Sequence, residues 1–309
     1  MGGRGETVGC ARGLMIDDAL FPGFTTHRIA THDTEIRCVV GGDGPPVLLL
    51  HGYPQTHVMW HRVAPALAHQ YSVVCADLRG YGDSGKPASD ATHAAYSKRA
   101  MAADMVELMR NLGHSQFRLV GHDRGGRVAH RLCLDHPDAV SQLAVLDISP
   151  TRTMFAHTDQ AFATAYYHWF FLIQPFDLPE RLIGADPAFY LERKLGGWGT
   201  GLAHFDSRAL VEYKRCYNDP ATIHASCEDY RAAASIDLDH DRADEAKRIE
   251  CPLLVLWGEN GVVNRLFKPL DDWRAVASDV RGRSLPCGHY LAEEVPDETL
   301  RELKAFFAV

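Results

Sequence analysis

Residues 119–127 (LVGHDRGGR) constrain the fold of this chain more than any other stretch. The mostly apolar run at 117–120 predicts a buried strand, and residues 128–134 predict a helix. Glycines flank the turn between them at the spacing of a nucleophile elbow, in which the residues beside the apex must lack bulk. We therefore predict a strand–turn–helix unit that exposes its apex, Asp123, above the carboxyl end of a sheet. The simpler alternative is that Asp123 only caps the helix.

An aspartate at the apex restricts the chemistry that such a turn can perform. A carboxylate can displace a leaving group from a saturated carbon and form an alkyl ester, which water then hydrolyses at the carbonyl carbon. A serine at the same place would form an ether, which a histidine-activated water cannot cleave. Asp123 therefore favours opening of a carbon–halogen bond or an epoxide over hydrolysis of esters or amides.

Short apolar runs recur along the chain and alternate with stretches of helical spacing. The predicted buried strands are 47–50, 71–76, 117–120, 143–148, 253–257 and 280–285, and 27–40 is predicted to form a hairpin-like pair. We expect helices from about 57 to 68 and at 96–112. Wholly apolar strands are typical of parallel sheets that helices cover on both faces. The pattern predicts the α/β class, with a mostly parallel central sheet flanked by helices.

The pattern changes between about residues 150 and 247, where prolines interrupt and no strand-like run occurs. Aromatic residues gather in this part, namely Phe162, Tyr166, Tyr167, Trp169, Phe170 and Phe171. Most aromatic residues of this kind pack in a core. We predict a core domain of residues 1–150 and 246–309, with residues 151–245 inserted as a helical cap above the carboxyl ends of the strands.

Composition and charge narrow the class of protein further. The chain has 309 residues, 46% of them apolar, which is enough for a large core, and a net charge of -8 without a basic block, which argues against nucleic acid as a partner. Residues 1–20 show no signal peptide, and no run is long enough to span a membrane. The eight cysteines are scattered without a CxxC pair. We expect buried thiols in a reducing compartment, no metal site and a cytoplasmic location.

The turn needs a general base that lies near it in space. Among the 17 histidines, His289 stands out because it follows the last predicted strand, beside a glycine. Two carboxylates could orient its imidazole: Asp147, which ends the strand at 143–148, and Glu259, which follows the strand at 253–257. We favour Asp147, because a carboxylate that closes a buried strand must be paired.

The loop after the first buried strand and the start of the elbow helix supply further groups. The backbone N–H groups of Tyr53 and Arg124 are the expected oxyanion hole. Arg124 and Arg127 lie three residues apart on one face of the helix, at its N-terminus, where cations oppose the helix dipole. An anion should offset that cost, either Asp123 itself or a substrate carboxylate, which two guanidinium groups can bind. Structural salt bridges of one or both arginines are the alternative.

Six segments match motifs of a known family. They are 51–55 (HGYPQ), 121–128 (GHDRGGRV), 145–148 (VLDI), 167–169 (YHW), 227–232 (CEDYRA) and 284–290 (SLPCGHY). With them, the chain resembles the fluoroacetate (haloacetate) dehalogenases of the α/β-hydrolase superfamily from about residue 21 to 307, cap included. The resemblance implies that Asp123 is the nucleophile, His289 the base and Asp147 its partner, and that Arg124 and Arg127 hold the substrate carboxylate.

The same resemblance implies that His168, Trp169 and Tyr230 surround the departing halide. Fluoride needs N–H and O–H donors in place as its charge develops, and imidazole, indole and phenol supply them. The resemblance also implies a homodimer without a cofactor. Tyr53 departs from it, because phenylalanine is expected there, and a phenol at the pocket wall would alter the size or polarity of the accepted substrate.

Two other kinds of function fit part of the sequence. An epoxide hydrolase would use the same Asp and His with two cap tyrosines, drawn from Tyr166, Tyr167, Tyr217 and Tyr230. A neutral epoxide or haloalkane gives no reason for Arg124 beside the nucleophile. A non-catalytic receptor could lose its nucleophile or base, whereas this chain keeps all three catalytic residue types. We therefore predict hydrolysis of a short 2-haloacid, such as haloacetate to glycolate and halide, and a small anionic molecule as the partner.

Overall fold

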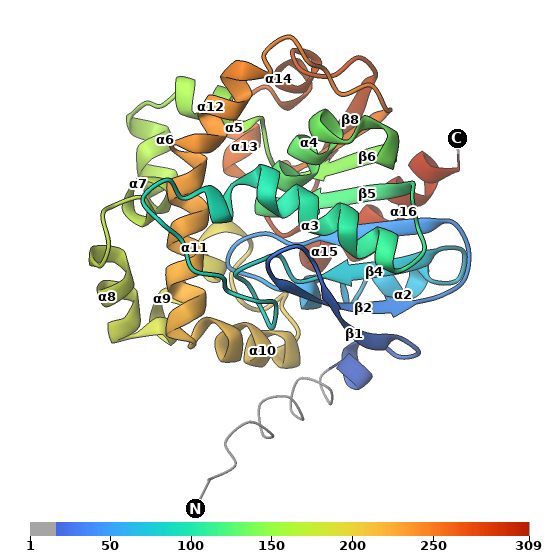
Figure 1. Ribbon diagram of the computed structural model, residues 1–309, viewed down its shortest axis with the longest axis horizontal. Helices are drawn as coiled ribbons and strands as arrows, with labels where there is room; N and C mark the ends of the chain where they lie inside the picture. Colours follow the sequence, from blue (N-terminus) through green and yellow to red (C-terminus); the bar gives the residue numbers. More distant parts are fainter. Residues whose placement is uncertain (1–16, 309) are drawn as a thin grey trace, which may run out of the picture.

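An eight-stranded sheet forms the centre of the protein in the computed structural model, which describes residues 17–308 (Figure 1). The strands are β1 (Thr25–Ala30), β2 (Glu35–Gly41), β3 (Pro46–Leu50), β4 (Ser72–Ala76), β5 (Phe117–His122), β6 (Val140–Leu146), β7 (Leu253–Gly258) and β8 (Val280–Leu285). Their order is β1-β2-β4-β3-β5-β6-β7-β8. The pairs β1–β2 and β2–β4 are antiparallel and the other pairs are parallel, which confirms the predicted mostly parallel sheet.

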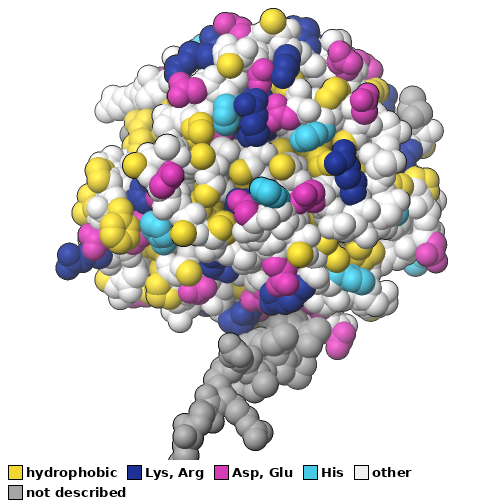
Figure 2. Space-filling model, in the orientation of Figure 1, with side chains coloured by type: hydrophobic (Ala, Val, Ile, Leu, Met, Phe, Trp, Pro, Cys, Tyr) yellow, Lys and Arg dark blue, Asp and Glu magenta, His cyan; other side chains and the backbone are white. Residues whose placement is uncertain are grey.

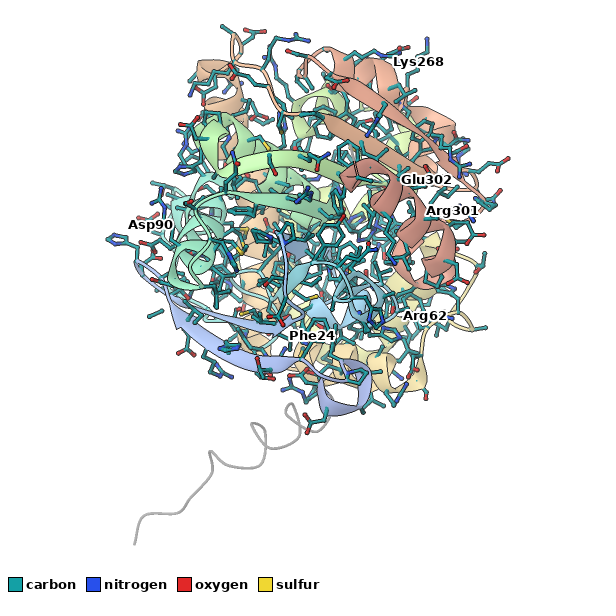
Figure 3. All side chains as sticks on the ribbon, turned by 90° about the vertical axis from the view of Figure 1, so that its right-hand side faces the viewer. Phe24, Arg62, Asp90, Lys268, Arg301 and Glu302 are labelled. Atoms are coloured by element: carbon teal, nitrogen blue, oxygen red, sulfur yellow. The ribbon has the colours of Figure 1, made fainter. Side chains whose placement is uncertain are left out.

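Helices cover both faces of the sheet. α3 (Lys98–Asn111) and α4 (Arg124–Asp135) pack together on one face, and α2 (Ala64–Leu67) contacts α16 (Pro296–Phe307) on the other. Other short elements of the core are η2 (Ala94–Tyr96), η3 (Pro137–Ala139), α13 (Val262–Leu266), α14 (Pro269–Arg274) and α15 (Leu291–Glu294). Figure 3 shows Arg301 and Glu302 of α16 on the outer side of that helix, while Leu303 is buried beneath it.

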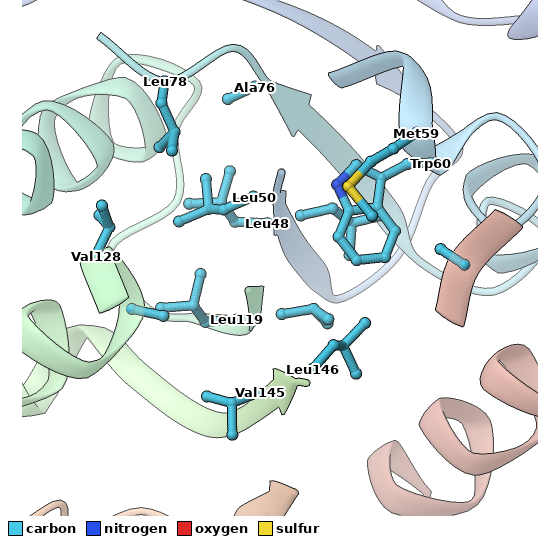
Figure 4. Close-up of a cluster of buried hydrophobic side chains, with 14 of the residues drawn as sticks. Leu48, Leu50, Met59, Trp60, Ala76, Leu78, Leu119, Val128, Val145 and Leu146 are labelled. Atoms are coloured by element: carbon cyan, nitrogen blue, oxygen red, sulfur yellow. The ribbon is translucent and has the colours of Figure 1, made fainter. Parts of the chain in front are cut away.

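The central strands are apolar because both of their faces are buried. Leu48 and Leu50 of β3, Leu119 of β5 and Val145 of β6 are fully buried and meet Val128 of α4 in one cluster (Figure 4). Alternate side chains of a strand point to opposite faces, so helices on both sides of the sheet require apolar residues throughout. This packing fixes the positions at which the strands end, and hence the positions of the loops that follow them.

The predicted helix from 57 to 68 is wrong. The structure has a 3-10 turn, η1 (His57–Trp60), and then the short α2. Pro65 lies in the first turn of α2, and its ring would clash with the carbonyl of residue 61 in a continuous helix. All four residues of η1 are buried, so its side chains show no alternation of buried and exposed positions that would mark a helix.

The segment between β6 and β7 consists of helices and loops, with one isolated β-bridge near its end. They are α5 (Thr151–Ala156), α6 (Gln160–Ala165), α7 (Tyr167–Leu172), α8 (Leu178–Ala185), α9 (Pro187–Trp198), α10 (Ser207–Tyr217), α11 (Pro220–Ala233) and α12 (Ile236–Ala243). Figure 1 shows α6–α11 gathered beside the sheet, on the left of the view. We call α5–α12 the cap, and its division from the core at residues 151 and 245 stays a proposal.

Acidic and basic side chains lie interspersed over the face shown in Figure 2. Within residues 17–308, no helix has the length and apolar character needed to cross a membrane. The seven described cysteines are free thiols, six of them buried, as predicted. Cys10 lies outside the described residues. So do residues 1–16 of the stretch 1–20, in which we predicted no signal peptide.

Candidate active site

The turn between β5 and α4 forms the predicted elbow. Asp123 is its apex, with φ 45° and ψ -112°, a backbone conformation that a residue with a side chain rarely adopts. A Cβ on Gly125 would lie 2.5 Å from the backbone oxygen of His51, and a Cβ on Gly121 would lie 2.5 Å from that of Gly125. Gly125 is therefore required by the approach of α4 to the end of β3, and Gly121 by the approach of the first turn of α4 to β5.

His289 is held against Asp147. Its Nδ1 donates to Asp147 Oδ2 at 2.6 Å, and the N–H of Gly258 donates to Asp147 Oδ1 at 2.9 Å. Glu259, the other sequence candidate, has an exposed side chain, so the structure brings Asp147 and not Glu259 to the imidazole. The Nε2 of His289 is buried without a partner among the described residues, which leaves it available to a water molecule.

Burial and charge act in opposite directions on His289. Burial lowers the pKa of the imidazole, but the hydrogen bond to Asp147 and the charges of Asp147 and Asp123 together raise it above its usual value. His122 lies behind the ring, with ring centroids 4.5 Å apart, and its Nε2 donates to the carbonyl of His289 at 2.8 Å. Burial lowers the pKa of His122 to about 3, so His122 is a neutral support.

The carboxylate of Asp123 is buried but ionised. Burial raises its pKa, whereas His289, Arg127, His122 and Arg124 together lower it below the usual value. Its Oδ1 accepts the backbone N–H of Tyr53 at 2.9 Å. The N–H of Arg124, the first residue of α4, has no intrahelical acceptor. Of the two expected oxyanion-hole donors, the Tyr53 N–H contacts this carboxylate, and the Arg124 N–H follows it directly in the chain.

Arg124 is fully buried and only partly paired. Its Nε and Nη2 donate to the two carboxylate oxygens of Asp229 on α11, at 2.9 and 2.6 Å. The guanidinium carbon lies 4.1 Å from the centroid of the Tyr230 ring, and Nη1 has no partner among the described residues. A structural salt bridge thus fixes one edge of Arg124 and leaves the other for a ligand. Asp229 was missed as a site residue, although it precedes Tyr230 in the motif at 227–232.

Arg127 has no paired carboxylate among the described residues. Its Nη1 donates to the carbonyl of Ser149 at 3.2 Å and to Oγ1 of Thr151 at 2.8 Å, while its Nε is buried without a partner. The guanidinium carbon lies 4.6 Å from the centroid of the Trp169 ring. Burial lowers the pKa of Arg127 to about 10, so the group remains a cation at neutral pH. A buried cation with so little compensation favours an anionic ligand.

The three predicted halide ligands share one feature, an unsatisfied buried polar atom. Nδ1 of His168, Nε1 of Trp169 and the hydroxyl of Tyr230 have no partner among the described residues. The ring centroid of Tyr230 lies 5.5 Å from that of His168 and 6.5 Å from that of Trp169, so the three side chains are neighbours. Burial lowers the pKa of His168 well below its usual value and keeps it neutral. Buried polar groups normally have partners, so this cluster points to a ligand.

The hydroxyl of Tyr53 belongs to a cluster of phenols. It lies 2.6 Å from the hydroxyl of Tyr217 on α10 and donates to that of Tyr190 on α9 at 3.3 Å. The phenol that replaces the expected phenylalanine is therefore bound by the cap, and its ring, 5.2 Å from that of Tyr230, is what faces the site.

Trp198 is a second residue that sequence reasoning missed. Its carbonyl accepts the N–H of His289 at 3.0 Å, and its ring centroid lies 4.4 Å from that of His168. Nothing in the local sequence marks it, because it ends a cap helix, α9, far along the chain from both partners.

Comparison with known proteins supports the fold class and the kind of active site described above. The sequence model of the α/β-hydrolase fold family matches residues 45–296. The chain is 51% identical to the fluoroacetate dehalogenase of a Burkholderia species, over 94% of this chain and 95% of that protein. It is 32% identical to the soluble epoxide hydrolase of a Corynebacterium species, over 92% of this chain and 97% of that protein.

Among solved structures, one from Nostoc sp. PCC 7120, of the α/β-hydrolase class, is 58% identical, with a TM-score of 0.92. The alignment covers 93% of this chain and 99% of the Nostoc chain. The elbow, the sheet order and these matches agree, and the chain belongs to the α/β-hydrolase family.

Proposed function

We propose that this protein hydrolyses short 2-haloacids, converting a haloacetate to glycolate and halide. The observation that carries the proposal is the pair of buried, incompletely paired guanidinium groups of Arg124 and Arg127 beside the ionised Asp123. A carboxylate on the substrate would otherwise be repelled by Asp123, and two cations remove that repulsion. The identity to a fluoroacetate dehalogenase supports the same substrate class.

In the first step, Asp123 attacks the carbon that bears the halogen. Because Oδ1 is held by the Tyr53 N–H, Oδ2 is the oxygen available for attack. A bond forms between Oδ2 and the carbon while the carbon–halogen bond breaks, and the halide leaves with the electron pair. The donors of His168, Trp169 and Tyr230 meet the developing negative charge, which lowers the barrier to departure. The products are an alkyl ester on Asp123 and a halide ion.

In the second step, water hydrolyses the ester. Nε2 of His289 takes a proton from the water, and the resulting hydroxide attacks the carboxyl carbon of Asp123. The N–H groups of Tyr53 and Arg124 hold the oxyanion at Oδ1. The intermediate then collapses, and glycolate leaves with the proton from His289. The water oxygen stays in the Asp123 carboxylate, and the second proton of the water is released to solvent.

Opening of an epoxide is the second candidate function. Of the four tyrosines weighed from the sequence, Tyr217 is bound to Tyr53 and Tyr167 is 47% exposed. Tyr166 and Tyr230 remain, both buried and both beside His168, with ring centroids 5.4 and 5.5 Å from it. The identity to a soluble epoxide hydrolase favours this alternative, whereas the unpaired Nη1 of Arg124 favours an anionic substrate.

Trapping the intermediate tests the proposal. In His289→Asn, attack by Asp123 remains possible but water is no longer activated, so the ester should accumulate. Intact-protein mass spectrometry after exposure to chloroacetate should show a mass increase of one carboxymethyl group, and Asp123→Asn is the control that cannot form it. The wild-type protein should release halide from fluoroacetate or chloroacetate at an ion-selective electrode. No adduct and no halide release would exclude dehalogenation, and an adduct with an epoxide in its place would favour the second candidate.

The expected homodimer and cytoplasmic location stay predictions. Light scattering on a size-exclusion column should give twice the mass of the chain if the homodimer forms. Chemistry at the site, as described above, uses residues of one chain only, so a monomer would contradict the expected assembly without affecting the proposed reaction.

A further inference from the structure

Lys194 is a buried amine in the cap. It lies on α9, and its side chain is almost completely inaccessible, since the residue is 2% exposed. Its Nζ lies 3.6 Å from the centroid of the Tyr167 ring and 4.7 Å from that of the Trp198 ring. No carboxylate among the described residues forms a salt bridge with it.

Lys194 lies between the surface of the cap and the candidate active site. On one side is Tyr167, whose side chain is 47% exposed. On the other is Trp198, whose ring centroid lies 4.4 Å from that of His168 and 5.3 Å from that of His289. Lys194 thus lies one aromatic ring away from the residues that we assign to the halide and to the water.

Three other buried cations, unlike Arg127, are paired with carboxylates. Lys98 contacts Asp229, Arg79 donates to Asp104 at 2.7 Å, and Arg37 lies 3.8 Å from Asp77. The Nζ of Lys194 contacts the rings of Tyr167, Trp198 and Tyr190, and the attraction of such rings for a cation is weak compared with the cost of removing an ammonium group from water. In agreement, burial alone lowers the pKa of Lys194 to about 7. Among the described residues the amine has no counter-ion, and an anion bound beside it would favour its charged form.

We propose that Lys194 is an anion-binding site outside the catalytic pocket, which takes small monovalent anions. A carboxylate entering the cap, or a halide leaving the pocket, would bind beside the amine and supply the missing charge. Trp198 contacts both Lys194 and His168, so an anion can bind at Lys194 before it enters the pocket or after it leaves. The identity of the passing anions rests on the proposed function, whereas anion binding itself does not.

A direct test uses bromide, which needs no turnover. Crystals of the wild-type protein and of Lys194→Arg, soaked in sodium bromide, should show an anomalous peak next to the side chain of residue 194. Crystals of Lys194→Met should lack that peak and keep any peak near the arginines. A wild-type crystal with bromide near the arginines but none at Lys194 would overturn the proposal.

Kinetics provide the second test, with halide release from chloroacetate as the readout. Lys194→Met should lower kcat/KM about tenfold through slower capture of the anion while kcat changes by less than about twofold, and Lys194→Arg should retain the wild-type value. Lys214→Met is the matched control, because it removes the same charge from the cap surface, where Lys214 pairs with Glu192. A loss of kcat without a change in KM, or equal effects in the Met and Arg variants, would show a packing role instead.

The two tests separate the two proposals. Bromide at Lys194 in a protein that releases no halide from any haloacid would contradict only the proposed function. Normal turnover with no bromide at Lys194 and an unaffected Lys194→Met would contradict only the anion site.

Discussion

Asp123 and His289 change charge in turn during the proposed reaction, and each affects the pKa of the other. In the resting site, the negative charge of Asp123 helps to raise the pKa of His289. Formation of the ester removes that charge, so the pKa of His289 falls at the stage when a neutral imidazole is needed to take a proton from water. The first step therefore prepares the base for the second.

The acid limb of the pH–rate profile tests this account. His289 must be neutral to act as a base, so the rate falls as the pH drops through its pKa. Asp147→Asn removes the hydrogen bond and the charge that raise this pKa, while burial still lowers it, so the acid limb should move to lower pH. The maximal rate should fall by a factor on the order of 10³–10⁴, because the imidazole also loses its orientation.

Glu259→Gln is the control for the same measurement. Glu259 is the other carboxylate that could orient His289 according to the sequence, and its side chain is exposed. Its profile of kcat against pH should match that of the wild-type protein. A shift in Glu259→Gln, or an unchanged profile in Asp147→Asn, would contradict the assignment of the orienting carboxylate.

At the scale of elements, the close approach of α4 to β3 holds the site together. The N–H of Gly125 donates to the carbonyl of His51 at 2.9 Å, and a Cβ on Gly125 would lie 2.5 Å from that oxygen and 2.6 Å from the backbone oxygen of Leu50. Both atoms belong to the backbone at the end of β3 and cannot rotate away. The position of the Arg124 N–H, which we propose for the oxyanion hole, depends on this contact.

Gly125→Ala should therefore weaken both the fold and the reaction. Overpacking of this kind lowers the free energy of unfolding by about 1–3 kcal/mol, measured by urea denaturation, and halide release should fall with it. Gly184→Ala, in α8, is the control, because its Cβ would meet nothing within 4 Å and alanine favours a helix by up to about 1 kcal/mol. Equal stability of the two variants would show that α4 can move away from β3 without cost.

The elements differ in how well the sequence predicts them, and the reason is their packing. Buried parallel strands are mostly apolar, so β5 and β6, and with them Asp147 directly after β6, could be placed by sequence. The strand before His289, β8, was also placed correctly, but the prediction that it is buried is wrong. It is the edge strand of the sheet, and its residues alternate between exposed and partly buried positions. The cap supplies its residues from several short helices, and the sequence does not show which helix faces the pocket. Asp229 and Trp198 were missed as site residues for that reason, whereas His168, Trp169 and Tyr230 came from the family resemblance alone.

At the scale of the whole molecule, the pKa values of some buried carboxyl groups are shifted in opposite directions, and two classes can be distinguished among the described residues. Asp77 and Asp229 are buried, but contacts with His57 and Arg37, and with Arg124 and Lys98, outweigh burial and lower their pKa values. Because their folded pKa lies below the unfolded value, their stabilising contribution is present at neutral pH and is lost as the pH falls below about 4. The second class has the opposite sign and destabilises the fold at alkaline pH.

Glu293, on α15, represents that second class. It is fully buried, and burial raises its pKa to about 8, although the hydroxyl of Tyr213 donates to its Oε1 at 3.0 Å and Nε2 of Gln55 donates to its Oε2. Oε1 of Gln55 has no partner among the described residues. The two ends of an amide are assigned from their contacts, so Gln55 turned by 180° would place this oxygen where it accepts the proton of a neutral Glu293.

Replacement of Glu293 by glutamine should make the stability less sensitive to alkaline pH. The folded pKa lies above the unfolded value, so the unfolded chain releases this proton first and stability falls as the pH rises from about 4.5 to about 8. Between pH 6 and pH 9, the wild-type protein should lose on the order of 2 kcal/mol more unfolding free energy than Glu293→Gln, measured by urea denaturation at both pH values. Glu250→Gln, at an exposed position, should behave as the wild-type protein does. An equal loss in Glu293→Gln and the wild-type protein would show that Glu293 is already ionised in the folded state at pH 6.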